Sequence, residues 1–291
     1  MAKAPTNFAA SVRQRLLNLA RAEGRVFDVV LVAFGLERLI YRLSVSPHRD
    51  RFVLKGGMLV TLWTADPGRF TRDVDFLGFG NDDEQQLRDV FADILSIDAG
   101  DGLVFETGEI TATAIREEQV YGGKRLRTRA YLGQTEIPIT VDLGFGDALS
   151  DPSYQIEYAS LLDFEPATIR AYSPATVIAE KLQAIVALGH ANSRMKDFYD
   201  LWAIPKATAI DTDNLKSAIA ATFLRRKTVI PKSRPAGLSD GFTTNPQKIA
   251  QWTAYAEATS LEDVTLDQVA DEIWAFVELA CSQASDSPGK L

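Results

Sequence analysis

The stretch FVLKGGMLVTLWTADPGRFTRDVDFLG, residues 52–78, carries the pattern that decides the fold of this chain. It opens with a short apolar run that predicts a buried strand, and KGG at 55–57 interrupts that run. The apolar residues that follow predict a short helix, DPG at 66–68 predicts a turn, and a second strand is expected over 73–77. These elements form one predicted unit: a strand, a glycine pair, a helix, a turn and a second strand. The rest of the chain is expected to be organised around it.

Asp73 and Asp75 are two residues apart on the second predicted strand, so their side chains are expected on the same face. Two adjacent carboxylates repel each other unless a cation lies between them, and Mg²⁺ prefers oxygen ligands of this kind. The glycine pair allows close approach of the backbone, and N–H groups at a helix start favour an anion. A tight turn and an exposed D-x-D pair are the alternatives for each feature alone. Their combination predicts a nucleoside triphosphate site with Mg²⁺.

Composition restricts the classes of function. The chain has 291 residues, enough for one large domain or two ordinary ones, and its net charge of −8 argues against a general polyanion binder. A single cysteine, Cys281, excludes an internal disulfide and lies in an apolar helical pattern that predicts a buried thiol. Two histidines make His-based metal sites and Ser-His triads improbable. The sequence contains no signal-peptide or membrane-span pattern, so a cytoplasmic protein without membrane contact is expected.

Hydrophobic periodicity predicts N-terminal helices that pack on the core (1–50), a strand-rich domain (51–171) and a C-terminal helical domain (172–291). Beyond the opening unit, helices are predicted over 7–22, 26–43, 82–97, 175–188, 211–223, 246–258 and 266–281, and strands over 103–105, 110–116, 124–132 and 136–143. Arg38 and Arg42, on the second helix, are read as part of a solvated face.

Two strands of the middle domain carry charges that need a reason. Asp142 lies deep in an apolar strand and becomes a third acidic group if this strand pairs beside Asp75; the alternative is that it ends the strand and faces solvent. Arg125, Arg127 and Arg129 alternate with smaller residues, which places three guanidiniums on one strand face. That face is either plainly exposed or contacts a phosphate backbone. An exposed basic loop over 225–234 is a second candidate for such a contact.

The C-terminal domain opens with a helix that Ser173-Pro174 starts and that contains Lys181. The segment SRMKDFYDLW, residues 193–202, begins a new helix on which Asp197 and Asp200 share a face. Surface ion pairing explains Asp200 poorly, because its neighbours are apolar and aromatic.

Four motifs, LKGGMLVTLW, GRFTRDVDFLG, AEKLQAI and SRMKDFYDLW, together resemble the AbiEii/AbiGii toxin family within the DNA polymerase β-like nucleotidyltransferases. The resemblance covers residues 55–202 in spaced blocks and implies an α+β fold: a nucleotidyltransferase-type mixed β-sheet with flanking helices, followed by a C-terminal helical domain. It identifies 51–171 as the catalytic domain and implies that 172–291 completes the active-site cleft.

The resemblance also implies roles for particular residues. Gly56 and Gly57 cradle the triphosphate, although many superfamily members have serine at the second position, and a serine hydroxyl contact would be lost here. Asp73 and Asp75 are both catalytic and metal-binding. Lys181 reaches the nucleotide phosphates, and Asp197 completes the site. The other residues predicted to bind nucleotide are Lys55, Arg72, Arg194 and Lys196, and Asp142 is predicted as a further metal ligand.

The resulting prediction is a Mg²⁺-dependent nucleotidyltransferase toxin, controlled by a cognate antitoxin, that transfers nucleotides from NTP to an RNA acceptor, namely the 3′ end of tRNA. Two alternatives stay open. One is nucleotidylation of a protein or small molecule, and the other is a GTP-binding regulator that performs no transfer.

Overall fold

The computed structural model describes residues 7–115, 122–259, 261 and 263–285 of the 291-residue chain. The described residues divide into two compact units. The first unit comprises those of Met1–Leu62, Phe70–Gly146 and Ser153–Ala171; the second comprises those of Trp63–Arg69, Asp147–Pro152 and Tyr172–Leu291. Two short segments that interrupt the first unit in sequence therefore belong to the second.

The elements of the first unit are α1 (Phe8–Ala22), α2 (Phe27–Val45), β1 (Phe52–Lys55), α3 (Gly57–Thr64), β2 (Val74–Gly78), α4 (Glu84–Leu95), β3 (Leu103–Phe105), β4 (Thr111–Ile115), β5 (Gly123–Leu132), β6 (Thr135–Phe145), β7 (Gln155–Tyr158) and β8 (Ala167–Arg170). The last two residues of α3 lie in the second unit. The predicted helices and strands of this region are confirmed, with ends shifted by at most two residues. The final residue of the predicted strand 110–116 lies outside the described residues.

The main sheet has the order β1-β2-β6-β5-β3, and β4 also pairs with β5. Strands β2 and β6 are parallel, whereas the other pairs are antiparallel. Strands β7 and β8 form a separate two-stranded sheet. The main sheet is therefore mixed, and together with its flanking helices it confirms the predicted α+β fold class.

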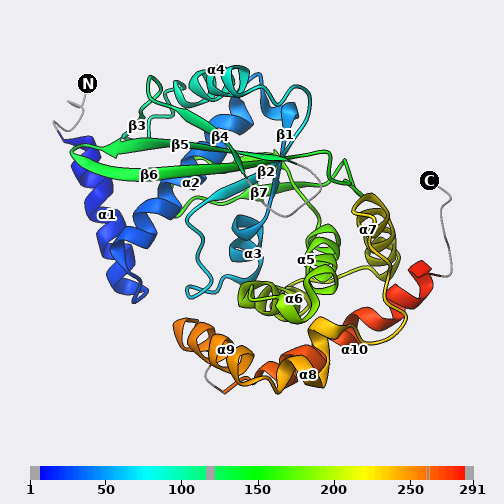
Figure 1. The fold of residues 1–291 in the computed structure, drawn as a ribbon. Helices are drawn as coiled ribbons and strands as arrows, with labels where there is room; N and C mark the ends of the chain where they lie inside the picture. The colour runs from blue at the N-terminus through cyan, green and yellow to red at the C-terminus, as the bar shows by residue number, and fades with distance from the viewer. Residues whose placement is uncertain (1–6, 116–121, 260, 262, 286–291) are drawn as a thin grey trace. The chain divides into compact units, whose positions relative to one another are not determined.

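Alternation along β6 separates the two faces of the sheet. Ile137, Ile139 and Val141 are buried, whereas Pro138 and Asp142 are not. Helix α2 packs on the buried face (Figure 1). At Gly35 of α2 a Cβ atom would lie 2.9 Å from Cδ1 of Ile139, so glycine permits this close approach. The face that carries Asp142 is the opposite one.

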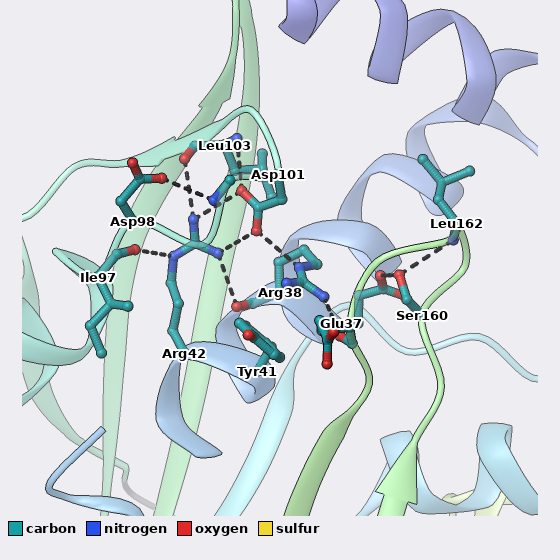
Figure 2. A network of polar contacts seen from close by, with 12 residues as sticks. Glu37, Arg38, Tyr41, Arg42, Ile97, Asp98, Asp101, Leu103, Ser160 and Leu162 are labelled. Carbon is teal, nitrogen blue, oxygen red and sulfur yellow. Dashed lines mark hydrogen bonds and ion pairs between the residues drawn. The ribbon is translucent and has the colours of Figure 1, made fainter. Parts of the chain in front are cut away.

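Two arginines on α2 correct a prediction. Arg38 and Arg42 were read as solvated, but they are 2% and 1% exposed. Both bind the buried carboxylate of Asp101, as Figure 2 shows. Helix α2 is therefore buried on its polar side as well, because a carboxylate from the loop before β3 neutralises its charges.

The second unit is helical (Figure 1). Its elements are α5 (Pro174–Leu188), α6 (Met195–Ala207), α7 (Thr212–Arg225), α8 (Asp240–Thr243), α9 (Pro246–Ala258) and α10 (Leu266–Ser285). The predicted start of α5 is confirmed: Ser173 is the N-cap, with Pro174 at the first helical position. Cys281 on α10 is fully buried, as predicted. None of the described helices is long and apolar enough to cross a membrane.

Candidate active site

The glycine pair lies between β1 and α3. Gly56 has φ +74°, in the left-handed region that glycine adopts without strain. A Cβ atom at Gly56 would lie 2.6 Å from Cγ and 2.8 Å from Cβ of Asp75, so a larger residue would collide with that carboxylate group. Gly57 is the first residue of α3, where backbone N–H groups have no partner within the helix. The arrangement brings an anion-binding helix start against the side chain of Asp75.

The carboxylates lie around strand β2. Asp75 pairs in register with Lys55 of β1 on one side and with Asp142 of β6 on the other. Asp73 directly precedes the strand, and the Thr71 hydroxyl donates to its Oδ1 at 2.6 Å. The predicted pairing of the Asp142 strand beside Asp75 is confirmed.

Asp142 is already held by a cation in this structure. Arg125 of β5 donates from Nε to Oδ1 at 2.7 Å and from Nη2 to Oδ2 at 2.5 Å. Such a bidentate pair uses both carboxylate oxygens. Among the residues that the structure describes, no three His, Cys, Asp or Glu side chains are grouped to hold a metal ion. The role of Asp142 as a metal ligand stays a prediction.

The arginine face of β5 is largely neutralised. Arg129 lies between Glu136 at 3.2 Å and Glu109 at 3.6 Å. Arg127 is exposed and faces Thr111 and Thr140 in the strand register. A groove of about 370 Å³ on this face contains Arg127 and Arg129 together with Glu106, Glu109 and Glu136. Its described acidic groups outnumber its basic ones, which does not favour a phosphate backbone.

The second unit contains a buried ion cluster built on α5 and α6. The Lys181 ammonium lies 2.8 Å from Oδ1 of Asp197 and 2.6 Å from Oδ2 of Asp200. Both aspartates are 0% exposed, and their common contact with Lys181 confirms that they share a helix face. Burial alone would lower the pKa of Lys181, but the charges of Asp197 and Asp200 outweigh it and raise that pKa. Lys181 is therefore a charged ammonium.

One oxygen of this cluster lacks a hydrogen bond. Nε of Arg194 lies 2.9 Å from Oδ2 of Asp197, close enough for an ion pair. The direction of the N–H bond does not suit a hydrogen bond, so this buried oxygen has no donor among the described residues. Arg194 is 43% exposed, so this end of the cluster faces solvent.

Arg69 completes the cluster and was missed in the sequence. Its Nε donates to Oδ1 of Asp200 at 2.6 Å, and its Nη2 donates to Oδ2 at 2.9 Å. Burial would raise the pKa of Asp200, but Lys181 and Arg69 outweigh it and lower that pKa. The only available signal was an arginine just before the D-x-D motif, and nothing local relates it to a residue 131 positions away.

The remaining predicted nucleotide-binding residues lie at the edges of these clusters. Lys55 ends β1, and Lys196 is exposed on α6. Arg72 is exposed, with its guanidinium carbon 5.8 Å from the ring centroid of Phe70.

The prediction that the basic loop 225–234 is exposed is partly wrong. Arg226 binds Asp147 at 3.1 Å and Glu180 at 2.7 Å, and Arg234 binds Asp271 at 2.6 Å. These two arginines are therefore committed to contacts within the second unit.

A glycine at positive φ against a strand carboxylate, before a helix and after a buried strand, suits the binding of an anion next to a cation. The chain belongs to the AbiEii family, described as nucleotidyl transferase AbiEii toxins of type IV toxin–antitoxin systems, whose sequence profile matches residues 38–278. Membership makes it a nucleotidyltransferase toxin with an NTP substrate and an antitoxin partner.

Two solved structures from Helicobacter pylori resemble this fold. One, described as a candidate nucleotidyltransferase, has a TM-score of 0.46 at 16% identity and covers 88% of this chain and 94% of its own. The other, JHP933, has a TM-score of 0.45 at 17% identity and covers 87% and 90%. No curated protein matches the chain.

Proposed function

We propose that this toxin is Mg²⁺-dependent and transfers nucleotides from NTP to an RNA acceptor, the 3′ end of tRNA, in the cytoplasm. The observation that carries the proposal is the contact between Gly56 and the Asp75 carboxylate at the start of α3. A helix start favours an anion, and an adjacent carboxylate favours a cation. A triphosphate with its metal satisfies both requirements.

The candidate site residues of the first unit bind the triphosphate or the metal. Backbone N–H groups at Gly56 and Gly57 hold phosphate oxygens, with Lys55 and Arg72 as further nucleotide contacts. Asp73, oriented by Thr71, and Asp75 hold the metal. When bound, Mg²⁺ neutralises phosphate charge and activates the attacking hydroxyl. Arg125 holds Asp142 beside Asp75, and Asp142 is a further ligand of the metal.

The second unit supplies further groups. Lys181 donates to a phosphate oxygen, and Arg194 and Lys196 add positive charge near it. Asp197 contributes the buried oxygen that lacks a donor. That these groups meet those of the first unit in one cleft stays a prediction, as do the domain boundaries at 51–171 and 172–291.

The RNA acceptor is supported by the family resemblance rather than by a basic surface. The described groove on the sheet is more acidic than basic, and Arg226 and Arg234 are occupied. The acceptor is accordingly the first part of the proposal to test.

The test is transfer of label from each α-³²P NTP to total RNA and to purified tRNA, with Mg²⁺ and after its removal by chelation. Asp75→Asn keeps the size of the side chain, so folding is preserved while a metal ligand is lost. We expect labelling to fall at least about 100-fold, since even outer partners of metal ligands cost about 10- to 100-fold when changed.

Asp93→Asn is the matched control, because Asp93 is an exposed residue of α4 whose side chain pairs, among the described residues, with His48 at 3.4 Å. It should transfer like the wild type. Equal labelling by wild type and Asp75→Asn would contradict the proposed site. Label in a protein band or a small product, with RNA unlabelled, would contradict the RNA acceptor but retain the transferase.

A further inference from the structure

The donors of Lys181 are not all used. An ammonium has three N–H donors, and here two carboxylates, Asp197 and Asp200, occupy two of them. The side chain is 12% exposed, so it lies near the surface of the unit. Within the described part of the chain, the third N–H therefore remains for an acceptor that comes from outside.

Asp200 fixes the direction of that third donor. Its Oδ2 accepts from Lys181 and from Nη2 of Arg69, and its Oδ1 accepts from Nε of Arg69. A bidentate guanidinium holds a carboxylate in one plane. The position of the Lys181 nitrogen thus depends on Arg69 through Asp200.

Arg69 is itself held in a short ordered segment. The backbone N–H of Arg69 donates to the carbonyl of Asp66 at 3.1 Å, and Oδ1 of Asp66 accepts from the N–H of Gly68 at 2.8 Å. The Tyr199 hydroxyl donates to the other oxygen of Asp66. A Cβ atom on Gly68 would lie 2.8 Å from Cα of Thr259, so this turn is tightly packed within the second unit. Arg69 is consequently presented to Asp200 from a fixed backbone.

The charges of the cluster favour an anionic ligand. Arg69, Lys181 and Arg194 are cations, and Asp197 and Asp200 are anions, which leaves one net positive charge. The buried members Arg69, Lys181, Asp197 and Asp200 balance, so the excess charge is that of Arg194 at the exposed end of the cluster, where it attracts an anion toward Lys181.

We propose that Arg69 and Asp200 are positioning residues that aim the third N–H of Lys181 at the triphosphate of the NTP substrate. This inference rests on the proposed function, because the transfer reaction is what supplies the triphosphate. Neither residue contacts the substrate; both act through Lys181.

The sharpest variant is Asp200→Asn, because positioning and plain electrostatics predict opposite signs. Removing a negative charge raises the net charge of the cluster, so electrostatics alone predicts tighter anion binding. Positioning predicts weaker binding, since Lys181 loses one of the two carboxylates that orient it. The readouts are calorimetric binding of tripolyphosphate with MgCl₂, and KM and kcat for each NTP.

We expect the Kd for tripolyphosphate and the KM for NTP to rise at least about tenfold, as for loss of one charge-assisted hydrogen bond, with a smaller change in kcat. In a Lys181→Met background, Asp200→Asn should add little to either value. Arg69→Gln, which retains Asp200, should weaken binding in the same direction. Asp211→Ala is the control, because it removes a helix cap of the same unit without touching the cluster.

Thermal unfolding establishes first that each variant is folded. Unchanged or tighter tripolyphosphate binding by folded Asp200→Asn would overturn the inference while leaving transfer by the wild type intact. Failure of both Asp200→Asn and Arg69→Gln to fold, with Asp211→Ala folded, would overturn it in favour of a purely structural role. Weaker binding by both variants in a protein that transfers no label would retain the positioning and refute the proposed reaction.

Discussion

Each unit contains a fully buried aspartate between two cations, and the two clusters differ in how completely they are satisfied. In the first unit Asp101 lies between Arg38 and Arg42 (Figure 2). In the second unit Asp200 lies between Arg69 and Lys181.

The Asp101 cluster is closed. Arg42 donates to the carbonyls of Ile97, Arg38 and Leu103 as well as to both oxygens of Asp101, so its five N–H groups are all used. Burial would raise the pKa of Asp101, but the two guanidiniums outweigh it and keep that pKa below its ordinary value. Arg42 therefore has no N–H left to bind a ligand.

The Asp200 cluster is open at one end. Lys181 retains a donor, Oδ2 of Asp197 lacks a hydrogen bond, and Arg194 is 43% exposed. A buried charge network with every group paired is a structural device, whereas a network with groups left over needs another partner. The two clusters thus differ at one cation each: every N–H of Arg42 has an acceptor among the described residues, whereas one N–H of Lys181 has none.

The largest effect should come from breaking the closed cluster. Asp101→Asn leaves two buried guanidiniums without a counter-charge, which should cost about 3–5 kcal/mol of unfolding free energy. The measurement is urea unfolding followed by circular dichroism. If the cluster is structural only, NTP affinity per folded molecule stays at the wild-type value. A loss of unfolding free energy below about 1 kcal/mol, which is typical of surface ion pairs, would contradict a structural role for the Asp101 cluster.

In the first unit the candidate ligand-binding position is Gly56 beside Asp75. A change there should lower the rate of NTP transfer. Gly56→Ala would place a methyl group against the Asp75 carboxylate and force it to move. Displacement of a positioned group by about 1 Å can lower a rate on the order of 100-fold. The measurement is the initial rate of NTP transfer at saturating substrate.

Gly80→Ala is the matched control for Gly56→Ala. Gly80 also has positive φ, +93°, but a Cβ atom there meets nothing within 4 Å. It carries the same backbone strain, about 1–2 kcal/mol, without the clash. An equal loss of rate in both variants would assign the effect to strain and not to the carboxylate.

Local signals in the sequence were sufficient for much of the fold. The N-cap at Ser173 and the alternation along β6 each depend on neighbours a few residues away. The pairing of Asp142 beside Asp75 was predicted only conditionally, and the register confirms it. The shared face of Asp197 and Asp200 followed from helical spacing, whereas their contacts with Lys181 on the neighbouring helix were not predicted.

The missed features are all long-range. Arg42 and Asp101 are 59 residues apart, and Arg69 and Asp200 are 131 apart. An arginine on a helix looks solvated in sequence until its distant carboxylate is known. The same reasoning failed for Arg226, whose partners Asp147 and Glu180 come from elsewhere in the second unit. Charge alone therefore overstated the exposed basic surface.

The smallest predicted effect concerns Glu37, a buried carboxylate beside the closed cluster. It accepts hydrogen bonds from the Ser160 hydroxyl and the Leu161 N–H but has no guanidinium fork. Burial raises its pKa from 4.5 to about 7, opposite to the shift at Asp101. The folded chain therefore holds a proton that the unfolded chain releases above pH 4.5.

Stability linked to Glu37 is thus fully present below pH 4.5 and is lost as the pH rises through about 7. Between pH 6 and 7 the wild type should lose about 1 kcal/mol of unfolding free energy on this account. Glu37→Gln stays neutral and should lack that loss, which urea unfolding at the two pH values would measure. Parallel pH profiles for wild type and Glu37→Gln would show that Glu37 is ionised throughout and belongs to the closed cluster as a third charged partner.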